Sequence, residues 1–347
     1  HARINCLRTA LIISVSTETI MNELGPLVET FAKIEPWRGS SIDGSFANFL
    51  GVMTDLEFVA RHHPSNAGQE SGNGAAETHM PKVEDGEPFF EFAAIHKAVL
   101  AARERFVMVE LGGGYAARSV DAYRALQNLN PMPCQLVIVE AEPTHFAWAK
   151  RHLEANGIDP REHWLIKAAV SADSNPKLFM VGSGVYYNGI VSPPDVAEVA
   201  EEIVKLDNTE AALRNLMAAG RCGMEIPYNS AAGMDLFDYK FVSAIPLADI
   251  LAPLPHVDLM DIDIQGAEDT AIHPAMDLLN SRVRRVHIGT HGADIHSGLW
   301  DLFFEHEWVC EFDYPPFNKN STPWGDFETT DGILHLYNPR LKTENIC

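Results

Sequence analysis

The chain has 347 residues, of which 46% are hydrophobic and 21% charged, a composition typical of a globular protein with a large core. Its 26 basic and 48 acidic residues give a formal charge of −22, which repels phosphate backbones and argues against a nucleic-acid substrate. No apolar run reaches the roughly 18 residues that a membrane-spanning helix needs.

The N-terminal part of the chain shows a helical pattern. Apolar residues recur three and four positions apart in Ile20 to Leu24 and again in Phe46 to Leu50, which predicts helices over residues 1–60. Residues 64–76 are rich in Gly, Ser and Asn and poor in large apolar groups, which predicts a loop or linker. We therefore expect an N-terminal helical extension and flexible linker over residues 1–85.

From residue 86 onward, short apolar runs alternate with helical patterns. Helices are predicted over Phe90 to Arg105, Ala116 to Asn128 and Thr144 to Ala155. The strand-like runs are Phe106 to Val109, Leu136 to Val139, Trp164 to Val170, Val257 to Ile262 and Val283 to Ile288. This alternation predicts an α/β domain over residues 86–347, with a mostly parallel sheet covered on both faces.

Two features depart from the alternation. The runs around Glu307 to Phe312 and Gly332 to Tyr337 have no clear helix between them, which predicts an antiparallel hairpin at the edge of the sheet. Residues 183–241 form an insertion that contains a helical stretch from Asp195 to Ala219. Since insertions between strands of such a sheet lie at the rim of the active site, we interpret this one as a lid or substrate wall.

The first motif with chemical meaning is VELGGGY, from Val109 to Tyr115, between a predicted strand and a predicted helix. Glycines there let the backbone approach a ligand, and the helix N-terminus favours polar or anionic groups. A plain glycine turn is the simpler interpretation. Gly112, Gly114 and Ala117 also satisfy a loose dinucleotide-binding pattern, so this motif alone does not choose between cofactors.

The second motif is an acid at the end of the next strand. A carboxylate there can accept both hydroxyl hydrogens of a ribose, because it lies across the crevice from the glycine turn. Glu140 and Glu142 compete for this role, since alternate residues of a strand share a face. A solvated carboxylate at a strand end is the alternative without function.

The third motif is VDLMDIDIQGAE, from Val257 to Glu268, and it is the most specific one. Asp261 and Asp263 project from the same side of the predicted strand. A buried acidic pair is unfavourable unless it holds a metal, a cation or a proton. A sulfonium cofactor and a hydroxyl that loses its proton would both use such a pair. Capping of the following helix by Asp263 is the structural alternative.

The fourth motif is HIGTHGADIH, from His287 to His296. An imidazole titrates near neutral pH, so His291 is our candidate for a general base or a substrate-binding group. Together with Asp261 and Asp263 it would also make a divalent metal site, for Mg²⁺ for example. A structural role for His291 is the third interpretation, and His287 is expected inside the strand.

Taken together, these motifs resemble the FkbM family of S-adenosylmethionine-dependent methyltransferases. The resemblance spans roughly residues 100–340 and rests on ELGGG from Glu110 to Gly114, on Glu142-Pro143, and above all on DIDIQGAE from Asp261 to Glu268. Weaker matches are Ala169 to Ser171, Asp331-Gly332 and Asn338-Pro339. The chain departs from the family pattern at Asp261, where a lysine is usual, and at Gly114, where an asparagine is usual.

The resemblance implies a Rossmann-like seven-stranded methyltransferase sheet, mostly parallel with an antiparallel C-terminal hairpin. It implies that S-adenosylmethionine binds with its ribose on Glu142, with Gly112 and Gly114 against its methionine part, and with the segment near Ala169 and Ser171 along its adenine. Glu110 and Tyr115 of the glycine-turn motif, and Asp261, are further candidate cofactor-binding residues.

The sequence therefore predicts O-methylation of a small-molecule or carbohydrate acceptor, such as a sugar, glycolipid or natural product. Asp263 or His291 would remove the proton, with Asp261 orienting the cofactor or a metal. One alternative is a nicotinamide-dependent oxidoreductase, which leaves the acidic third motif unexplained. Another is a non-catalytic cofactor-binding subunit that uses its acidic surface and N-terminal helices as an interface.

The cysteines bear on the cellular location. There are five of them, far apart and without a C-x-x-C pair, which argues against a zinc cluster or a disulfide framework. A reducing, cytoplasmic location is therefore expected. A brief apolar run after Arg8 makes a signal peptide the minor alternative. A homo-oligomer is compatible with these features.

Overall fold

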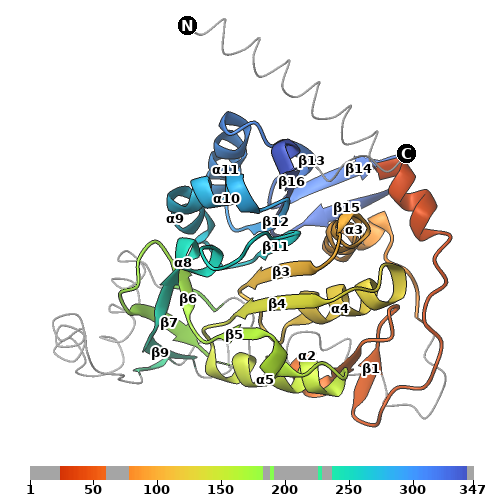
Figure 1. Cartoon of the computed structure of the whole chain (residues 1–347), viewed down its shortest axis with the longest axis horizontal. Coiled ribbons are helices and arrows are strands. Elements are labelled where there is room, and N and C mark those ends of the chain that lie inside the picture. The colour runs from red at the N-terminus through yellow and green to blue at the C-terminus, as the bar shows by residue number, and fades with distance from the viewer. Residues whose placement is uncertain (1–23, 60–77, 183–187, 191–225, 229–236, 342–347) are drawn as a thin grey trace, which may run out of the picture.

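The computed structural model describes residues 24–59, 78–182, 188–190, 226–228 and 237–341 (Figure 1). Its centre is a seven-stranded sheet in the order β13-β16-β12-β11-β3-β4-β5. The strands from β12 to β5 pair in parallel, and β16 pairs antiparallel with both β12 and β13. The predicted Rossmann-like α/β fold, with its antiparallel C-terminal edge, is confirmed. The bounds of these strands are β3 (Phe106–Leu111), β4 (Cys134–Val139), β5 (Trp164–Ile166), β11 (Leu259–Ile262), β12 (Arg285–Thr290), β13 (Val309–Tyr314) and β16 (Gly332–Tyr337).

Helices cover both faces of the sheet, because alternate residues of the central strands face opposite cores. Met108 and Leu136 pack on one side with residues of α3, α4 and α5. Val107 and Val137 pack on the other side with residues of α8, α9, α10 and α11 (Figure 1). The helices are α3 (Glu87–Ala101), α4 (Ala117–Leu129), α5 (Pro143–Ala155), α8 (Leu247–Leu251), α9 (Glu268–Ile272), α10 (Met276–Arg282) and α11 (Ala293–Glu305), and the short 3-10 turns are η2 (Val83–Asp85), η3 (Pro160–Glu162), η4 (His273–Ala275) and η5 (Pro339–Leu341). Burial on both faces explains why these strands read as continuous apolar runs.

The order of the strands creates a switch point. From β3 the chain continues to β4 and β5 on one side, and it later returns to the other side of β3 as β11 and β12. In open parallel sheets, a crevice forms where the connections diverge in this way, outside the carboxyl ends of the strands. Here the crevice lies beyond Leu111 and Ile262, which are paired in register.

The N-terminal segment differs from the prediction. Residues 24–31 are helical, but the stretch from Phe46 to Leu50 is not. It belongs to a hairpin of β1 (Ser45–Ala47) and β2 (Met53–Asp55), followed by α2 (Leu56–Val59). The Asn48 side chain accepts hydrogen bonds from the N–H groups of Leu50 and Val52. These bonds stabilise the turn between β1 and β2, so the segment forms a hairpin instead of a helix. The described part of this segment packs into the core of the larger domain through Leu24, Leu27 and Phe31.

The predicted strand from Trp164 to Val170 is divided in two. β5 ends at Ile166, and the chain then leaves the central sheet to form β6 (Ala169–Ser171), which pairs in parallel with β10 (Ala244–Pro246). Ala169 N–H already donates to the carbonyl of Ser243. An apolar run alone does not reveal that its two halves pair with different partners.

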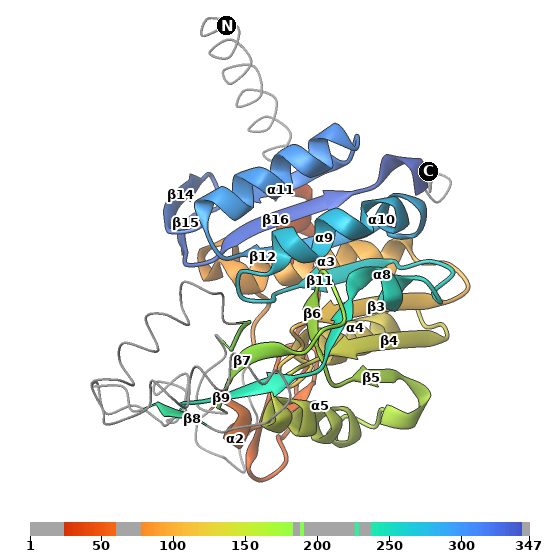
Figure 2. The same cartoon turned by 90° about the vertical axis from the view of Figure 1, so that its left-hand side faces the viewer.

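The insertion joins a three-stranded antiparallel sheet in the order β7-β9-β8, in which β7 precedes the insertion, β8 lies within it and β9 ends at Val242, just after it. Its strands are β7 (Lys177–Val181), β8 (Ile226–Tyr228) and β9 (Phe237–Val242). Figure 2 shows β7 and β9 on the opposite side of the molecule from α11. The helix predicted from Asp195 to Ala219 and the loop predicted over residues 64–76 lie outside the described residues.

The segment of chain that connects β13 to β16 forms a second hairpin, of β14 (Asn318–Thr322) and β15 (Gly325–Thr329), which was not predicted. Within the described residues, each helix is too short or too polar to span a membrane.

Candidate functional site

A cavity of about 650 Å³ opens at the carboxyl edge of the central sheet, at the switch point between β3 and β11. The glycine turn after β3, the acid after β4 and the acidic end of β11 all line it. Phe46 and Val59 of the N-terminal segment and Asn188 and Ile190 of the insertion complete its wall. Motifs that lie far apart in the sequence therefore meet in one place, because the ends of parallel strands share one edge.

The glycine turn is required by the packing of β11 as well as by space for a ligand. Gly112 has a φ of +77°, and a Cβ at this position would lie 1.7 Å from the carbonyl oxygen of Asp263. The N–H groups of Gly112 and Gly113 both donate to the carbonyl of Val139, at 3.0 Å. The sequence analysis expected glycine to make room for a ligand, whereas the structure shows that Gly112 makes room for the end of β11.

This packing makes Gly112→Ala strongly destabilising. We expect the free energy of unfolding to fall by about 3 kcal/mol or more, because the new methyl group overlaps a backbone atom that cannot rotate away. Gly157→Ala is a matched control, since Gly157 has a φ of +74° and its added methyl group would have no described neighbour within 4 Å. It should lower the free energy of unfolding by only about 1 kcal/mol. Urea denaturation measures both values, and equal losses would contradict the packing argument.

Glu140 and Glu142 have different positions. Glu140 lines the cavity, and its carboxylate accepts hydrogen bonds from the N–H groups of Gly114, at 2.7 Å, and Glu142, at 2.6 Å. Burial, and more weakly the charge of Glu142, raise the pKa of Glu140 to about 8. The Glu142 carboxylate instead accepts from His145 N–H at 2.6 Å and caps α5. Glu142 is absent from the cavity wall. The acid that the resemblance assigns to the ribose is therefore the N-cap residue of α5, and Glu140 is the acid that faces the cavity.

Four other predicted cofactor positions can be compared with the cavity. Glu110 lines it and accepts hydrogen bonds from Arg118 N–H and Ser119 N–H, which caps the start of α4. Burial raises the pKa of Glu110 to about 7. Tyr115 and Ala169 also line the cavity. Ser171 does not line the cavity. It is buried, and its hydroxyl accepts a hydrogen bond from Asp173 N–H at 3.3 Å.

Asp261 and Asp263 both line the cavity. Asp261 is in register with Glu110 on β3 and with His287 on β12, so three polar side chains meet inside the sheet. Burial, together with the charge of Glu110, raises the pKa of Asp261 well above its usual range. Asp263 follows the strand end, is 47% exposed at its side chain, and accepts from Gln265 Nε2 at 2.8 Å.

The helix-capping role considered for Asp263 is absent. The chain turns through Gln265 and Gly266, which have φ values of +52° and +94°, before α9 begins at Glu268. The N-cap position of α9 is Ala267, and no side chain caps the helix there. Asp263 is therefore available to a ligand in the cavity.

His291 is an ion-paired side chain behind Asp263. Its Nδ1 lies 2.8 Å from Glu268 Oε1, and its Nε2 lies 3.4 Å from Asp263 Oδ1 and 3.7 Å from Asp331 Oδ1. Burial lowers the pKa of His291, but the hydrogen bond to Glu268 and the three carboxylates outweigh this effect and raise it to about 9. The imidazole is then protonated at neutral pH and cannot accept a proton, so the geometry does not favour His291 as the general base.

Asp263 is the better placed base of the two. Although about half of its side chain is exposed, Asp263 is surrounded by protein on its other sides, and this desolvation raises its pKa to about 6, with the charge of His291 acting against the rise. Its carboxylate is therefore mostly ionised at neutral pH and faces the cavity.

The predicted metal site of Asp261, Asp263 and His291 is not assembled. In the part of the chain that the structure describes, no group of three or more His, Cys, Asp or Glu side chains is arranged to hold a metal ion. The physical reason lies in His291, whose two ring nitrogens face the carboxylates of Glu268 and Asp263 and whose raised pKa favours the protonated ring, which has no free electron pair for a metal.

The structure adds cavity residues that the sequence analysis did not select. They are Glu87 and Glu91 of α3, Arg118 of α4, Asn188, His287 and Asp331. Asp331 precedes β16, and because β16 is antiparallel, its beginning lies at the same edge as the ends of the parallel strands. The position of Asp331 could have been inferred from the sequence, because the predicted antiparallel hairpin already placed the start of the last strand at this edge.

Acidic side chains dominate the cavity wall. The carboxyl groups are those of Glu87, Glu91, Glu110, Glu140, Asp261, Asp263 and Asp331. Arg118 is the only Arg or Lys in the wall among the described residues. A cavity of this composition favours a cationic or hydrogen-bond-donating ligand over an anion.

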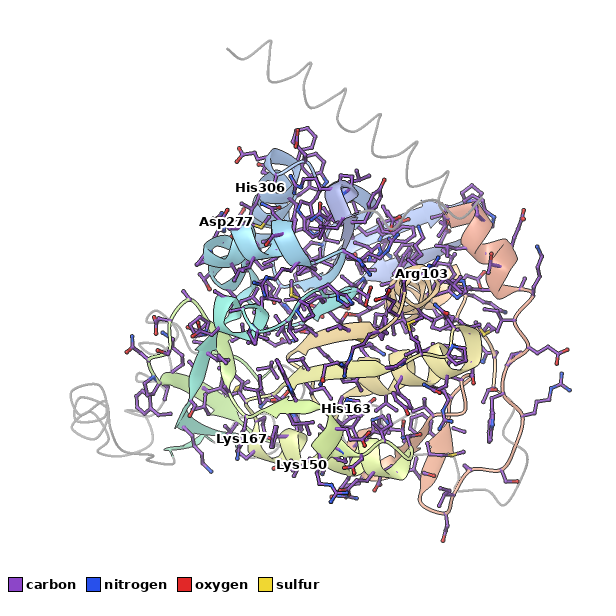
Figure 3. The ribbon with its side chains drawn as sticks, viewed as in Figure 1. Arg103, Lys150, His163, Lys167, Asp277 and His306 are labelled. Atoms are coloured by element: carbon purple, nitrogen blue, oxygen red, sulfur yellow. The ribbon has the colours of Figure 1, made fainter. Side chains whose placement is uncertain are left out.

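Another hollow lies at the edge of the sheet beyond β5. Lys150 of α5 and His163 border it, and Figure 3 shows both near this edge. Its wall comes from α5, from the segment that leads into β5 and from Leu165 of β5, and it shares no residue with the cavity at the switch point. None of the sequence motifs reaches this hollow.

Comparison with known proteins supports the interpretation at a coarse level. No protein-family model matches the chain. A protein of Jannaschia sp. (strain CCS1), named "Putative methyltransferase", is 24% identical over 298 residues, which cover 86% of this chain and 94% of that protein.

Solved structures are similar at lower identity. Precorrin-6y C5,15-methyltransferase from Geobacter metallireducens GS-15 is 12% identical with a TM-score of 0.34, over 71% of this chain and 87% of that one. Methyltransferase FkbM from Methylobacillus flagellatus KT is 11% identical with a TM-score of 0.36, over 68% of this chain and 45% of that one. Both scores are low, so neither protein's activity is transferred to this chain. The sequence relative and the sheet topology support a methyltransferase, while membership of the FkbM family stays a prediction.

Proposed function

We propose that the protein is an S-adenosylmethionine-dependent methyltransferase that methylates a hydroxyl oxygen of a sugar, a glycolipid or a natural-product small molecule. The observation that carries this proposal is Glu140, which lines the cavity beside the glycine turn. Its carboxylate accepts two backbone hydrogen bonds and keeps about two further acceptor positions, which suit the two hydroxyl groups of a ribose.

The remaining wall suits the rest of the cofactor. Ala169 and Phe179 offer apolar surface beside Glu140 for an adenine ring. Asn188 Oδ1 is buried without a hydrogen-bond partner among the described residues and can accept from an amino group. The carboxylates of Asp261 and Asp263 lie beyond the glycine turn, where they favour a positive charge. When bound, S-adenosylmethionine supplies a methyl group on a positively charged sulfur.

The chain itself would contribute position and proton transfer. Asp263 faces the cavity as a carboxylate and accepts the proton of the acceptor hydroxyl as the new oxygen–methyl bond forms. His291, held by Glu268, keeps Asp263 ionised and oriented. Phe46 and Val59 pack with Trp148 of α5 and would close the cavity on the side of Glu140. Holding the acceptor oxygen close to the methyl group is the larger part of the catalysis expected for such a transfer.

The two alternatives fit the cavity less well. A nicotinamide dinucleotide would place a pyrophosphate at the glycine turn, where the N–H groups of Gly112, Gly113 and Gly114 already donate to Val139 and Glu140 and leave no donor for a phosphate. A non-catalytic subunit would have no use for an exposed Asp263 supported by His291.

Calorimetric titration separates these functions. S-adenosylhomocysteine should bind with a micromolar dissociation constant, and NADH should not bind at the same concentrations. Transfer of a labelled methyl group to a hydroxyl in a panel of sugars and natural products then tests for catalysis. Binding of NADH in place of S-adenosylhomocysteine would overturn the proposal, and tight cofactor binding without transfer to any acceptor would favour the subunit.

The affinity for S-adenosylhomocysteine should rise with pH. Burial raises the pKa of Glu140 to about 8, and only the ionised carboxylate accepts from both ribose hydroxyls. Below pH 8 the protein must lose this proton to bind, so affinity should increase by up to about tenfold per pH unit between pH 6 and 8 and then level off. Calorimetry at several pH values measures this slope. A Glu140→Gln variant should show a flatter profile, and an unchanged slope in that variant would assign the effect to another group.

A further inference from the structure

The cavity has two distinct ends. Glu140 follows β4, whereas Asp331 precedes β16, and four strand spacings separate these two strands in the order β16-β12-β11-β3-β4. At about 4.8 Å per spacing the two ends lie about 19 Å apart along the sheet. If the adenosyl group occupies the end at Glu140, the end at Asp331 and α3 is left for the acceptor.

Glu91 lies on α3 one helical turn after Glu87, whose carboxyl is close enough to interact with the charges of both Glu91 and Asp331, and Glu91 lacks one hydrogen-bond partner. It is 8% exposed, and its Oε1 forms an ion pair with Arg118. Its Oε2 is buried and has no partner among the described residues, although the side chain lines the cavity. Burial raises the pKa of Glu91 to about 7, and Arg118 opposes the rise only in part. A buried carboxylate oxygen without a donor is unfavourable, so this position suits a donor on a ligand.

His287 provides a second, independent acceptor in the same wall. It is 4% exposed and lines the cavity, and its Nδ1 has no hydrogen-bond partner within the described residues. Burial lowers the pKa of His287 well below its usual range, so the ring is neutral. A neutral imidazole nitrogen can accept a hydrogen bond from a ligand.

The cations at this end are already engaged by other groups. Arg118 pairs with Glu91 and lies 4.0 Å from Asp121, and His291 is bound to Glu268. Glu87 and Asp331 contribute further carboxyl groups to the wall. Without a cation, burial and the charge of Glu91 raise the pKa of Glu87 to about 8, so a proton occupies part of this cluster. A donor-rich, positively charged group on a ligand would take the place of that proton.

We propose that the acceptor is a hydroxyl compound that carries an ammonium group, of the amino-sugar or amino-alcohol class, and that Glu91, Glu87 and Asp331 bind this ammonium. The inference rests on the proposed methyltransferase function and narrows its substrate class. With its ammonium held on the α3 side, the acceptor directs a neighbouring hydroxyl towards Asp263. An acceptor with a phosphate or carboxylate would not form these ion pairs, and it would be repelled increasingly as Glu91 and Glu87 ionise above pH 7 to 8.

Matched pairs of probes test this inference. The full chain is saturated with S-adenosylhomocysteine and titrated by saturation-transfer NMR with glucosamine and glucose, and with 2-aminoethanol and ethane-1,2-diol. Each amine should bind at least about tenfold more tightly than its neutral partner, which corresponds to one charge-assisted hydrogen-bonded pair. Glu91→Gln and Asp331→Asn should each reduce this preference to about twofold or less. Glu84→Gln, an acid-to-amide change on the neighbouring turn η2, should preserve it.

The outcomes separate the two proposals. If the wild-type chain does not bind S-adenosylhomocysteine, the methyltransferase proposal fails and this inference fails with it. If the chain binds S-adenosylhomocysteine but shows no preference for amines, or binds none of the probes, only the inference is overturned. A preference that persists in both variants would overturn the assignment of the ammonium to Glu91 and Asp331. Asp331→Asn keeps the test valid if Glu91→Gln prevents folding, because the Asp331 side chain is 33% exposed.

Discussion

Replacing Glu140 by glutamine should weaken the binding of S-adenosylhomocysteine by about 100-fold. The variant removes the charge that accepts from the ribose hydroxyls, and each such hydrogen bond to a charged group contributes about 1.5 kcal/mol or more. It also places an amide –NH₂ against either Gly114 N–H or Glu142 N–H, which are both donors. Calorimetric titration at pH 9 measures the loss, since the wild-type carboxyl, with a pKa of about 8, is largely ionised there.

Glu142→Gln is the matched control, because the same chemical change is made two residues further along. Its carboxylate accepts from His145 N–H at the start of α5, so the variant should lower the free energy of unfolding by about 1 kcal/mol and leave the affinity within about threefold. The two variants thus distinguish the acid that faces the cavity from the acid that begins the helix. The opposite pattern, with affinity lost only in Glu142→Gln, would restore the role that the family resemblance implies.

Replacing Asp263 by asparagine should reduce the rate of methyl transfer by about 1,000-fold. An asparagine cannot accept the proton of the acceptor hydroxyl, and proton transfer by a positioned base contributes roughly a hundredfold to ten-thousandfold. The affinity for S-adenosylhomocysteine should stay within about threefold, because the ribose and adenine contacts lie on the side of Glu140. Single-turnover assays with labelled cofactor measure the rate, and calorimetry measures the affinity.

Asp269→Asn is the control for this change. Asp269 lies on α9, where it pairs with His273 at the surface, and its replacement should leave both quantities unchanged. Full activity of the Asp263→Asn variant would remove Asp263 from the chemistry. A joint loss of affinity and rate would instead assign Asp263 to cofactor binding.

The elements of the central domain could be predicted because their signals are local. β3 and β4 are short apolar runs whose residues are largely buried, and a buried strand needs no more than such a run. The glycine turn after β3 lies between a strand and a helix, as the pattern from Val109 to Tyr115 indicated. Since strands that alternate with helices pair in parallel, the meeting of the glycine turn with Asp261 and Asp263 at one edge also followed from the sequence.

Elements that depend on a distant partner could not be predicted in this way. Phe46 to Leu50 has helical spacing, but Ala47 pairs with Met53 and Asn48 closes the turn between them. The run from Trp164 to Val170 is largely apolar, yet its second half leaves the central sheet to pair with β10. The spacing of apolar residues indicates which residues of a segment are buried, but it does not indicate which strand the segment pairs with.

The sequence by itself determined the class of the fold, the glycine turn at the switch point and the acidic end of β11. Only the tertiary structure decided that Glu140 rather than Glu142 faces the cavity, that three carboxylates raise the pKa of His291 and favour its protonated form, and that Asp331 joins the site from the start of an antiparallel strand. The physical reason is that burial patterns arise along one segment, whereas the ionisation and orientation of a side chain depend on neighbours that distant segments bring to it.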